Sequence, residues 1–332
     1  MSGIDYKKEI IKLKKQLDVT VVGHFYQKDE VFALADITGD SLELAKKCKD
    51  DSAKYVVFCG VGFMGQSVKI LDPNKQVFMP RVACCSMAKM IDSTYFDASV
   101  DFMVRKGIKK EDILPITYIN SDAGVKAAVG KMGGLVCTSS NAYKIIEQGL
   151  KSGKKILFVP DRCLGQNFAK QMGLKSCVIG DGKDPKECDI ICFDGFCAVH
   201  QLFEPDDIDF YRKKYPDILV AVHPECDVAV CEKADFVGST SQIIKYVQNL
   251  DPNQKVVVGT EYNLVNRLRE KNTYVLSATK PECPTMNETT LKDLYECLVA
   301  IKEGNPINEI FVEQEVLKYA KIALDRMLEV KV

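Results

Sequence analysis

The feature that most constrains the fold is a pattern that occurs three times along the chain, in which an apolar run ends in a polar–x–polar triplet. The runs are VTVVG, ILPIT and ILVAV, and their triplets are His24-Phe25-Tyr26, Tyr118-Ile119-Asn120 and His223-Pro224-Glu225. The triplets begin 94 and 105 residues apart, close to the length of one small α/β unit. Short β-branched runs alternate with helical stretches between them, as in proteins with parallel sheets. The pattern predicts three α/β units in tandem.

Two further strands are predicted in each unit, in the same order. The second runs are VVFCGVG, LVCTSSNA and DFVGSTSQ, which lead into helices at Gln66-Ser67, Ser139-Ser140-Asn141 and Ser239-Thr240-Ser241. The third runs are QVFMP, KILFVP and KVVVG. In open parallel sheets ligands bind beyond the carboxyl ends of the strands, where all three triplets lie. We therefore expect one central site at which the three units converge.

Composition excludes several classes of function. The formal net charge of the 332 residues is −1, and no basic stretch is long enough to indicate nucleic-acid binding. The start of the chain lacks the apolar segment of a signal peptide, and no apolar run is long enough to span a membrane. We expect a soluble cytoplasmic protein. Its fourteen cysteines should then be reduced thiols, either buried or bound to a metal.

The segment Gly60-x-Gly62-x-x-Gly65 has the spacing of a dinucleotide-binding loop. Such a loop normally follows the first strand of its unit, whereas this one follows the predicted second strand. The next strand, which ends at Pro80, also lacks the acidic residue that would bind a ribose. We expect the glycines to allow close approach of the backbone instead. An NAD(P)-dependent oxidoreductase remains the alternative function.

One cysteine follows each predicted unit at the junction to the next, namely Cys85, Cys197 and Cys283. Three thiolates that meet on one axis could hold zinc, or an iron–sulfur cluster with one iron left free for a ligand. The spacing also leaves open that these are unrelated buried thiols. Cys188 and Cys192 do not have the spacing of a zinc ribbon, and Cys192 lies in an apolar run that predicts packing.

Eleven short motifs resemble those of the quinolinate synthase family, in the same order. They are GHFYQ, ADITGDS, CSMA, YINSDAGVKA, CTSSNA, PDRCLGQ, CAVHQ, HPEC, GSTSQ, GTEYNL and CPTM, and they extend from about residue 20 to residue 295. The resemblance implies an α/β fold of three αβα units related by pseudo-threefold symmetry, with short parallel sheets around a central active site. It also implies the condensation of iminoaspartate with dihydroxyacetone phosphate, with loss of phosphate and two waters, to form quinolinate for NAD biosynthesis.

The resemblance further implies a [4Fe–4S] cluster with three cysteine ligands and one open iron. The motif cysteines fall on Cys85, Cys197 and Cys283, with the adjacent Cys84 as an alternative to Cys85. The implied substrate contacts are His24, Tyr26, Ser41, Tyr118, Asn120, Ser139, His223, Glu225, Ser239 and Thr240. We expect the three units to comprise residues 1–84 with 290–332, 85–170, and 171–289.

Four of these residues are predicted to be catalytic: Glu225, Tyr26, Tyr118 and His223. We expect Glu225 to transfer protons, because a neighbouring ligand anion and low solvent access would raise its pKa into a useful range. Tyr26 and Tyr118 could donate to developing oxyanions or gate entry. His200 is expected to be a buried structural histidine, with a position beside the cluster as the alternative.

Both implied substrates are anionic, and no arginine occurs in the triplets. Recognition by hydroxyls, imidazoles and helix N-termini is therefore expected, with Ser139, Ser239 and Thr240 placed where strands lead into helices. Ser41 could instead be a helix cap. A transient aspartate-oxidising enzyme, dependent on flavin or NAD, is the expected partner, because iminoaspartate is unstable. A non-catalytic, zinc-stabilised module is kept as a third hypothesis.

Overall fold

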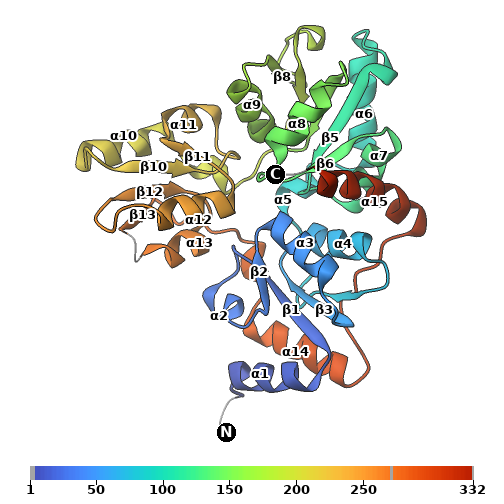
Figure 1. Ribbon diagram of the computed structural model, residues 1–332, viewed down its shortest axis with the longest axis vertical. Coiled ribbons are helices and arrows are strands. Elements are labelled where there is room, and N and C mark those ends of the chain that lie inside the picture. Colours follow the sequence, from blue (N-terminus) through green and yellow to red (C-terminus); the bar gives the residue numbers. More distant parts are fainter. Residues whose placement is uncertain (1–3, 270–271, 331–332) are drawn as a thin grey trace.

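The computed structural model describes residues 4–269 and 272–330. These residues form three parallel sheets, each in a unit of its own, and the units meet around a common centre (Figure 1). The predicted α/β class with three short parallel sheets is confirmed. Within the described residues, no helix combines the length and the apolar character needed to cross a membrane.

The first unit contains a sheet with the strand order β2-β1-β3-β4, in which every neighbouring pair is parallel. Its elements are α1 (Tyr6–Gln16), β1 (Val19–His24), α2 (Asp29–Phe32), β2 (Ile37–Gly39), α3 (Ser41–Asp50), β3 (Tyr55–Cys59), α4 (Gly62–Leu71), β4 (Gln76–Phe78) and the short α5 (Ser86–Lys89). The first triplet begins at the last residue of β1, so that its side chains lie at the carboxyl edge of the sheet.

The second unit contains five parallel strands in the order β6-β5-β7-β9-β8. Its elements are α6 (Ser93–Arg105), β5 (Ile113–Tyr118), α7 (Ala123–Lys131), β6 (Leu135–Cys137), α8 (Ala142–Leu150), β7 (Lys155–Val159), α9 (Arg162–Gln171), β8 (Ser176–Val178) and β9 (Ile190–Cys192). Every residue of β5 is buried, as expected for a parallel strand that is covered on both faces.

The third unit contains parallel strands in the order β11-β10-β12-β13. Its elements are α10 (Pro205–Lys214), β10 (Leu219–Val222), α11 (Val228–Lys233), β11 (Phe236–Val237), α12 (Thr240–Gln248), β12 (Val256–Gly259), α13 (Tyr262–Arg267) and β13 (Thr273–Val275). A 3₁₀ turn at His200–Leu202 precedes the unit, and another at Met286–Glu288 follows it. Two helices, α14 (Leu291–Lys302) and α15 (Gln314–Glu329), end the described chain.

The second strand of the first unit is not the one predicted from the sequence. The run VVFCG forms β3, which pairs with β1 on the side that corresponds to β7 and β12 in the other units. The true second strand is β2, and its three residues are too few to show a recognisable alternation. The prediction was therefore wrong here, because the run assigned to the second strand of the unit forms the third strand. As a consequence, the helix that follows the second strand of the first unit is α3, which begins at Ser41.

The final helices and the edge of the second sheet do not follow the unit boundaries expected from the sequence. The strands β8 and β9 extend the second sheet to Cys192, past the boundary expected at residue 170. The helix α14 packs on α1 in the first unit, whereas α15 packs on α7 and β6 of the second unit and also on α4. The division of the chain into units stays a prediction.

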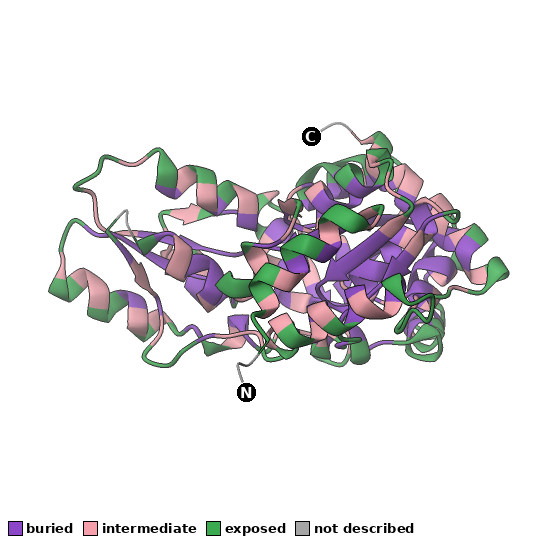
Figure 2. Ribbon diagram, turned by 90° about the horizontal axis from the view of Figure 1, so that it is seen from below, coloured by how far each residue is buried: buried purple, intermediate pink, exposed green. Residues whose placement is uncertain are grey.

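The first two units share an apolar core, whereas the third unit has cores of its own. One cluster of buried side chains joins the strands of the first and second sheets to the inner face of α15, and a second cluster lies between the first sheet, α1 and α14. Alternate residues of β10 and β12 contribute to two separate clusters, one on each face of the third sheet. Buried residues accordingly fill the interior beneath exposed helix faces (Figure 2).

Candidate active site

The three units enclose a cavity of about 60 Å³ at the point where the carboxyl ends of their strands converge. Of the thirteen residues predicted for the site, all but Ser239 line this cavity. The twelve are His24, Tyr26, Ser41, Cys85, Tyr118, Asn120, Ser139, Cys197, His223, Glu225, Thr240 and Cys283. Residues from segments far apart in the sequence are thus brought to one place, although their individual roles remain predictions.

Two of the three triplets have the same local geometry. The Nδ1 atom of His24 accepts a hydrogen bond from the backbone N–H of Tyr26 at 3.1 Å, and Nδ1 of His223 accepts one from the N–H of Glu225 at 3.3 Å. Burial lowers the pKa of His24 to about 4 and that of His223 to about 3. Both imidazoles are therefore neutral at pH 7, with the proton on Nε2 available as a donor.

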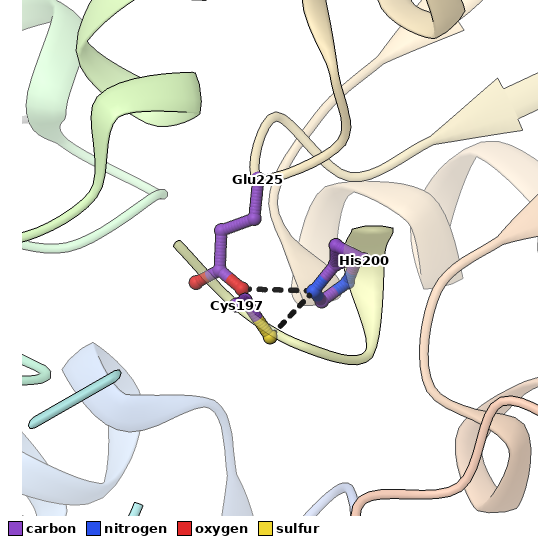
Figure 3. Close-up of side chains that lie close together, drawn as sticks. All are labelled: Cys197, His200 and Glu225. Atoms are coloured by element: carbon purple, nitrogen blue, oxygen red, sulfur yellow. Dashed lines mark hydrogen bonds and ion pairs between the residues drawn. The ribbon is translucent and has the colours of Figure 1, made fainter. Parts of the chain in front are cut away.

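Glu225 lies among hydrogen-bond donors (Figure 3). Nδ1 of His200 is 2.9 Å from Oε2 of Glu225 and 3.1 Å from Sγ of Cys197. Burial raises the pKa of Glu225, but His200 and His223, together with hydrogen bonds from His200 and Tyr118, outweigh burial and lower this pKa to about 2. The raised pKa was expected for a site that holds a ligand anion; in the ligand-free site the pKa is lowered. The ionised carboxylate can accept a proton at neutral pH.

A chain of hydrogen bonds connects Tyr26 to this carboxylate. The phenol oxygen of Tyr26 lies 2.9 Å from Oγ1 of Thr260 and 3.1 Å from Oγ1 of Thr240, and Nε2 of His200 lies 3.1 Å from Oγ1 of Thr260. The side chains of Tyr26, Thr260, His200 and Glu225 thus form one continuous series of hydrogen-bonding contacts. The chain joins residues of the first and third units through the 3₁₀ turn that contains His200.

The three cysteines occupy equivalent places in the three units. The strands β3, β7 and β12 occupy the same place in their sheets, and each is followed by a helix. The N–H of the first residue of that helix donates to the carbonyl of the residue two positions before the cysteine. These bonds run from Gly62 to Ala83, from Arg162 to Gly195 and from Tyr262 to Pro281, at 2.8, 2.8 and 2.9 Å. Each sulfur also accepts a hydrogen bond from the backbone N–H three residues later, at Ala88, His200 and Met286 respectively.

The protonation of these thiols depends on what they bind. Burial raises the pKa of Cys85 to about 12 and also raises the pKa values of Cys197 and Cys283. All three therefore stay protonated at neutral pH unless a cation is bound. The adjacent Cys84 is exposed and does not line the cavity, which favours Cys85 for this position.

The cavity is lined by carboxyl groups and not by cationic side chains. Asp40, Glu225 and Glu261 contribute to the lining, and none of the lining residues in the described ranges is lysine or arginine. Burial raises the pKa of Glu261 to about 8, so that this carboxyl group is protonated at neutral pH. An anionic ligand would therefore be bound by hydroxyls, neutral imidazoles, helix N-termini and any cation held by the thiols.

Three helices begin at the cavity. Ser41 is the first residue of α3, Thr240 is the first residue of α12, and Ser139 lies in the turn before α8. The cap of α3 is Asp40, so the interpretation of Ser41 as a cap is wrong. The cap of α12 is Ser239, which is fully buried and accepts a hydrogen bond from the N–H of Gln242.

Comparison with known proteins shows the family of this chain. A family model described as "Quinolinate synthetase A protein" matches residues 8–329. A quinolinate synthase of Helicobacter pylori (strain ATCC 700392 / 26695) is 56% identical over 331 residues, which cover 98% of each chain. The quinolinate synthase of Acidobacterium capsulatum is 42% identical and covers 94% of this chain and 88% of its own. The chain belongs to the quinolinate synthase family.

Quinolinate synthases from distant sources align over a similar span. The protein from Haloarcula marismortui is 38% identical and covers 94% of this chain and 88% of its own. A solved structure of an acyclic imino acid reductase in complex with NADPH and D-Arg is 13% identical and covers 93% of this chain and 90% of its own, with a TM-score of 0.21, a likeness too weak to support any inference. The resemblance to the quinolinate synthase family, stated from the sequence motifs, is confirmed.

The glycine-rich loop makes contacts within the protein. A Cβ on Gly60 would overlap the ring of Phe58, and one on Gly65 would lie 3.0 Å from the sulfur of Met79. The N–H of Gly62 makes the structural hydrogen bond to Ala83 described above. These contacts explain the glycines through close packing, as predicted, and no observation supports the oxidoreductase alternative.

The sequence analysis missed four polar residues that line the cavity: Asp40, Thr138, Glu261 and Thr285. It also missed Thr260, which does not line the cavity but lies within hydrogen-bond distance of Tyr26 and His200. Thr260 and Glu261 follow β12 directly, so the rule that placed the triplets at strand ends would also have selected them. Asp40 follows β2, the strand that the sequence analysis did not recognise.

Proposed function

We propose that this chain condenses iminoaspartate with dihydroxyacetone phosphate, with loss of phosphate and two waters, to form quinolinate for the de novo synthesis of NAD. Membership of the family supports this reaction. The observation that carries the proposal is the equivalent placement of Cys85, Cys197 and Cys283 around one cavity that is also lined by hydroxyl, imidazole and carboxyl groups. A site built from cysteines and hydroxyls suits both a metal cofactor and anionic substrates.

The three thiols are suited to hold a [4Fe–4S] cluster, because iron–sulfur clusters are bound by cysteine thiolates. Each sulfur already accepts a backbone N–H, an interaction that stabilises a thiolate once iron replaces the proton. When bound through only three cysteines, the cluster supplies an iron that acts as a Lewis acid toward a substrate oxygen or nitrogen.

Substrate binding is assigned to residues on the first turns of helices and at the ends of strands. Ser41, Ser139 and Thr240 would contact phosphate or carboxylate groups, and the Nε2–H groups of His24 and His223 would add two further donors. The contact predicted for Ser239 has no support in the structure, because its side chain caps α12, its backbone N–H donates to Gln242 and the residue does not line the cavity. Buried Oδ1 of Asn120 has no hydrogen-bond partner among the residues that the structure describes, which suits an acceptor for a substrate N–H or O–H.

Proton transfer is assigned to Glu225, with Tyr118 and Tyr26 as donors. The carboxylate of Glu225 is ionised and can take a proton from a substrate carbon or nitrogen. Burial, and next the charge of Glu225, raise the pKa values of both tyrosines well above 10, so their phenols stay protonated and can donate to a developing oxyanion. His223 lies beside the carboxylate and helps to orient the reacting group.

The proposal includes a cytoplasmic location and a transient partner. All fourteen cysteines are free thiols, as expected in a reducing compartment. Iminoaspartate hydrolyses readily in water, so an aspartate-oxidising enzyme that uses flavin or NAD would have to supply it close to this chain.

Anaerobic purification followed by iron, sulfide and zinc analysis, together with an assay for quinolinate formation, tests the proposal. We expect about four irons and four sulfides per chain, and loss of both cluster and activity in each of Cys85→Ser, Cys197→Ser and Cys283→Ser. The matched controls Cys188→Ser and Cys192→Ser should retain the cluster. Zinc in place of iron, or a full cluster in any of the first three variants, would overturn the ligand assignment.

A further inference from the structure

One carboxylate connects all three units beside the cavity. Oδ1 of Asp40, which caps α3 in the first unit, accepts from the N–H groups of Leu42 and Glu43, each at 3.0 Å. Oδ2 of the same residue accepts from Oγ of Ser140 at 2.9 Å and from Oγ of Ser241 at 2.7 Å. Ser140 belongs to the second unit and Ser241 to the third, 100 and 201 residues away in the sequence.

The two serines lie at equivalent points of their units. Each follows the strand that corresponds to β2, namely β6 or β11, and lies at the start of the next helix, α8 or α12. Each is also adjacent in sequence to a residue of the cavity: Ser140 follows Ser139, and Ser241 follows Thr240. Asp40 itself precedes Ser41. Through these hydrogen bonds, Asp40 connects the N-terminal ends of α3, α8 and α12, where Ser41, Ser139 and Thr240 lie.

The bonding of Asp40 argues for positioning and against direct substrate binding. A carboxylate has about four acceptor sites, and the four N–H and O–H donors described above occupy them. Asp40 is only 6% exposed, so that no further donor is needed to satisfy it. Its negative charge lies at the positive ends of three helix dipoles, which favours an anion there, and would repel an anionic substrate that approached it directly.

We infer that Asp40 is a positioning residue, which holds the substrate-binding site together by accepting hydrogen bonds from Ser140 and Ser241. These bonds set the relative positions of Ser41, Ser139 and Thr240. This inference rests on the proposed function, in which those three residues bind the anionic substrates. We call the set Asp40, Ser140 and Ser241 the clasp. The hydrogen bonds of the clasp favour the state in which the three units are assembled around the cavity.

The variant Ser140→Ala/Ser241→Ala removes both clasp hydroxyls and leaves Asp40 on its helix cap. Neither serine lines the cavity, so no proposed substrate contact is lost. Substrate binding must then supply the free energy of assembly, which raises KM by roughly tenfold for the pair while kcat changes less than about threefold. The variant Ser140→Thr/Ser241→Thr keeps both hydroxyls and should restore KM.

Ser152→Ala is the matched control, because Oγ of Ser152 donates to the carbonyl of Gly149 within a single unit, at 2.6 Å. KM of this variant should equal that of the wild type. The single variants Ser140→Ala and Ser241→Ala serve if the double variant does not fold. Their effects on KM should be non-additive, because either loss already weakens the assembly of three units. An unchanged KM in both single variants and in the double variant would refute the inference.

Hydrogen exchange of the holoprotein without substrate provides a readout that is independent of activity. Loss of the clasp should speed exchange at the start of α12 and at the start of α8, while α1 and α14 stay as protected as in the wild type. Unchanged exchange at both helix starts would overturn the inference even if the wild type forms quinolinate. Conversely, a wild type that forms no quinolinate would defeat the proposed function but leave this exchange measurement valid.

Discussion

At the scale of single residues, the charge states of the cavity depend on partners from other units. Glu225 is buried, which by itself favours the neutral acid, yet His200 and Tyr118 hydrogen-bond to its carboxylate and keep it ionised. The sequence places Glu225 at a strand end but does not reveal that His200 will face it. The structure places Glu225 at the cavity and lowers its pKa in the absence of a ligand, while the raised pKa expected beside a bound anion stays a prediction.

Lys126 is a second residue whose environment is set by tertiary structure. Its side chain is fully buried, with Nζ donating to the carbonyls of Ile119 and Ser121 and lying 5.5 Å from the centre of the Phe63 ring. It therefore fixes the segment that contains Asn120. Burial lowers the pKa of Lys126 to about 7.

This pKa predicts an unusual dependence of stability on pH. Between pH 7 and about 10.5 the unfolded chain holds a proton on Lys126 that the folded chain has lost, so the contribution of this residue to stability rises with pH, by at most about 1.4 kcal/mol per pH unit. Urea unfolding of the wild type and of Lys126→Met at pH 7, 8 and 9 measures it. The free energy of unfolding of the wild type minus that of the variant should increase from pH 7 to pH 9. Other groups titrate equally in both proteins and cancel in this difference. A constant difference would contradict the lowered pKa.

The limits of sequence reasoning are clear from the serines and from Asp40. Ser239 and Thr240 follow a strand in the same way, and only the structure shows that one caps α12 while the other lines the cavity. The bonds of Asp40 to Ser140 and Ser241 join points that no local pattern relates. The cysteines and triplets were predictable because a strand end is visible in the sequence and because the pattern repeats.

At the scale of elements, the closest packing joins α7 to α15. A Cβ on Gly130 in α7 would overlap the carbonyl oxygen of Tyr319 in α15. The glycine allows the two backbones to approach, at a cost in helix propensity of about 1 kcal/mol. Among the strands, the three-residue β2 was not predicted from the sequence, whereas the six-residue apolar strand β5 was.

Gly130→Ala should destabilise the protein by about 3 kcal/mol, because the added methyl group must push α15 away from α7. Thermal unfolding of the purified variant measures the loss. Gly124→Ala in the same helix is the matched control, since a Cβ there would meet only a side-chain oxygen of Asp122, at 3.2 Å. The control should change stability by less than about 1 kcal/mol. Equal stability of the two variants would show that the contact of α7 with α15 is looser than described.

At the scale of the whole molecule, the third unit is joined to the rest mainly by polar contacts. Its apolar clusters are separate from those of the first two units. Arg267 in α13 donates to the carbonyls of Phe25 and Gln27 in the first unit and pairs with Asp29 at 2.6 Å. The third unit is therefore the part best able to move during substrate entry.

Arg267→Gln should weaken this attachment, because it removes an ion pair and the charged hydrogen bonds to two carbonyls, a loss of about 1–3 kcal/mol. Small-angle X-ray scattering without substrate should then show an expanded molecule. Arg212→Gln is the matched control, since Arg212 pairs with Asp235 inside the third unit. Identical scattering curves for the wild type and Arg267→Gln would mean that other contacts fix the third unit.

The position of α14 and α15 has a consequence for biosynthesis. Both helices follow the three sheets in the sequence, yet α14 packs on α1 and α15 packs on α7 and α4. A nascent chain on the ribosome therefore leaves apolar faces of its first two units uncovered until these helices are made, while the third unit already has its whole sheet. During that interval the uncovered apolar faces are natural binding sites for chaperones.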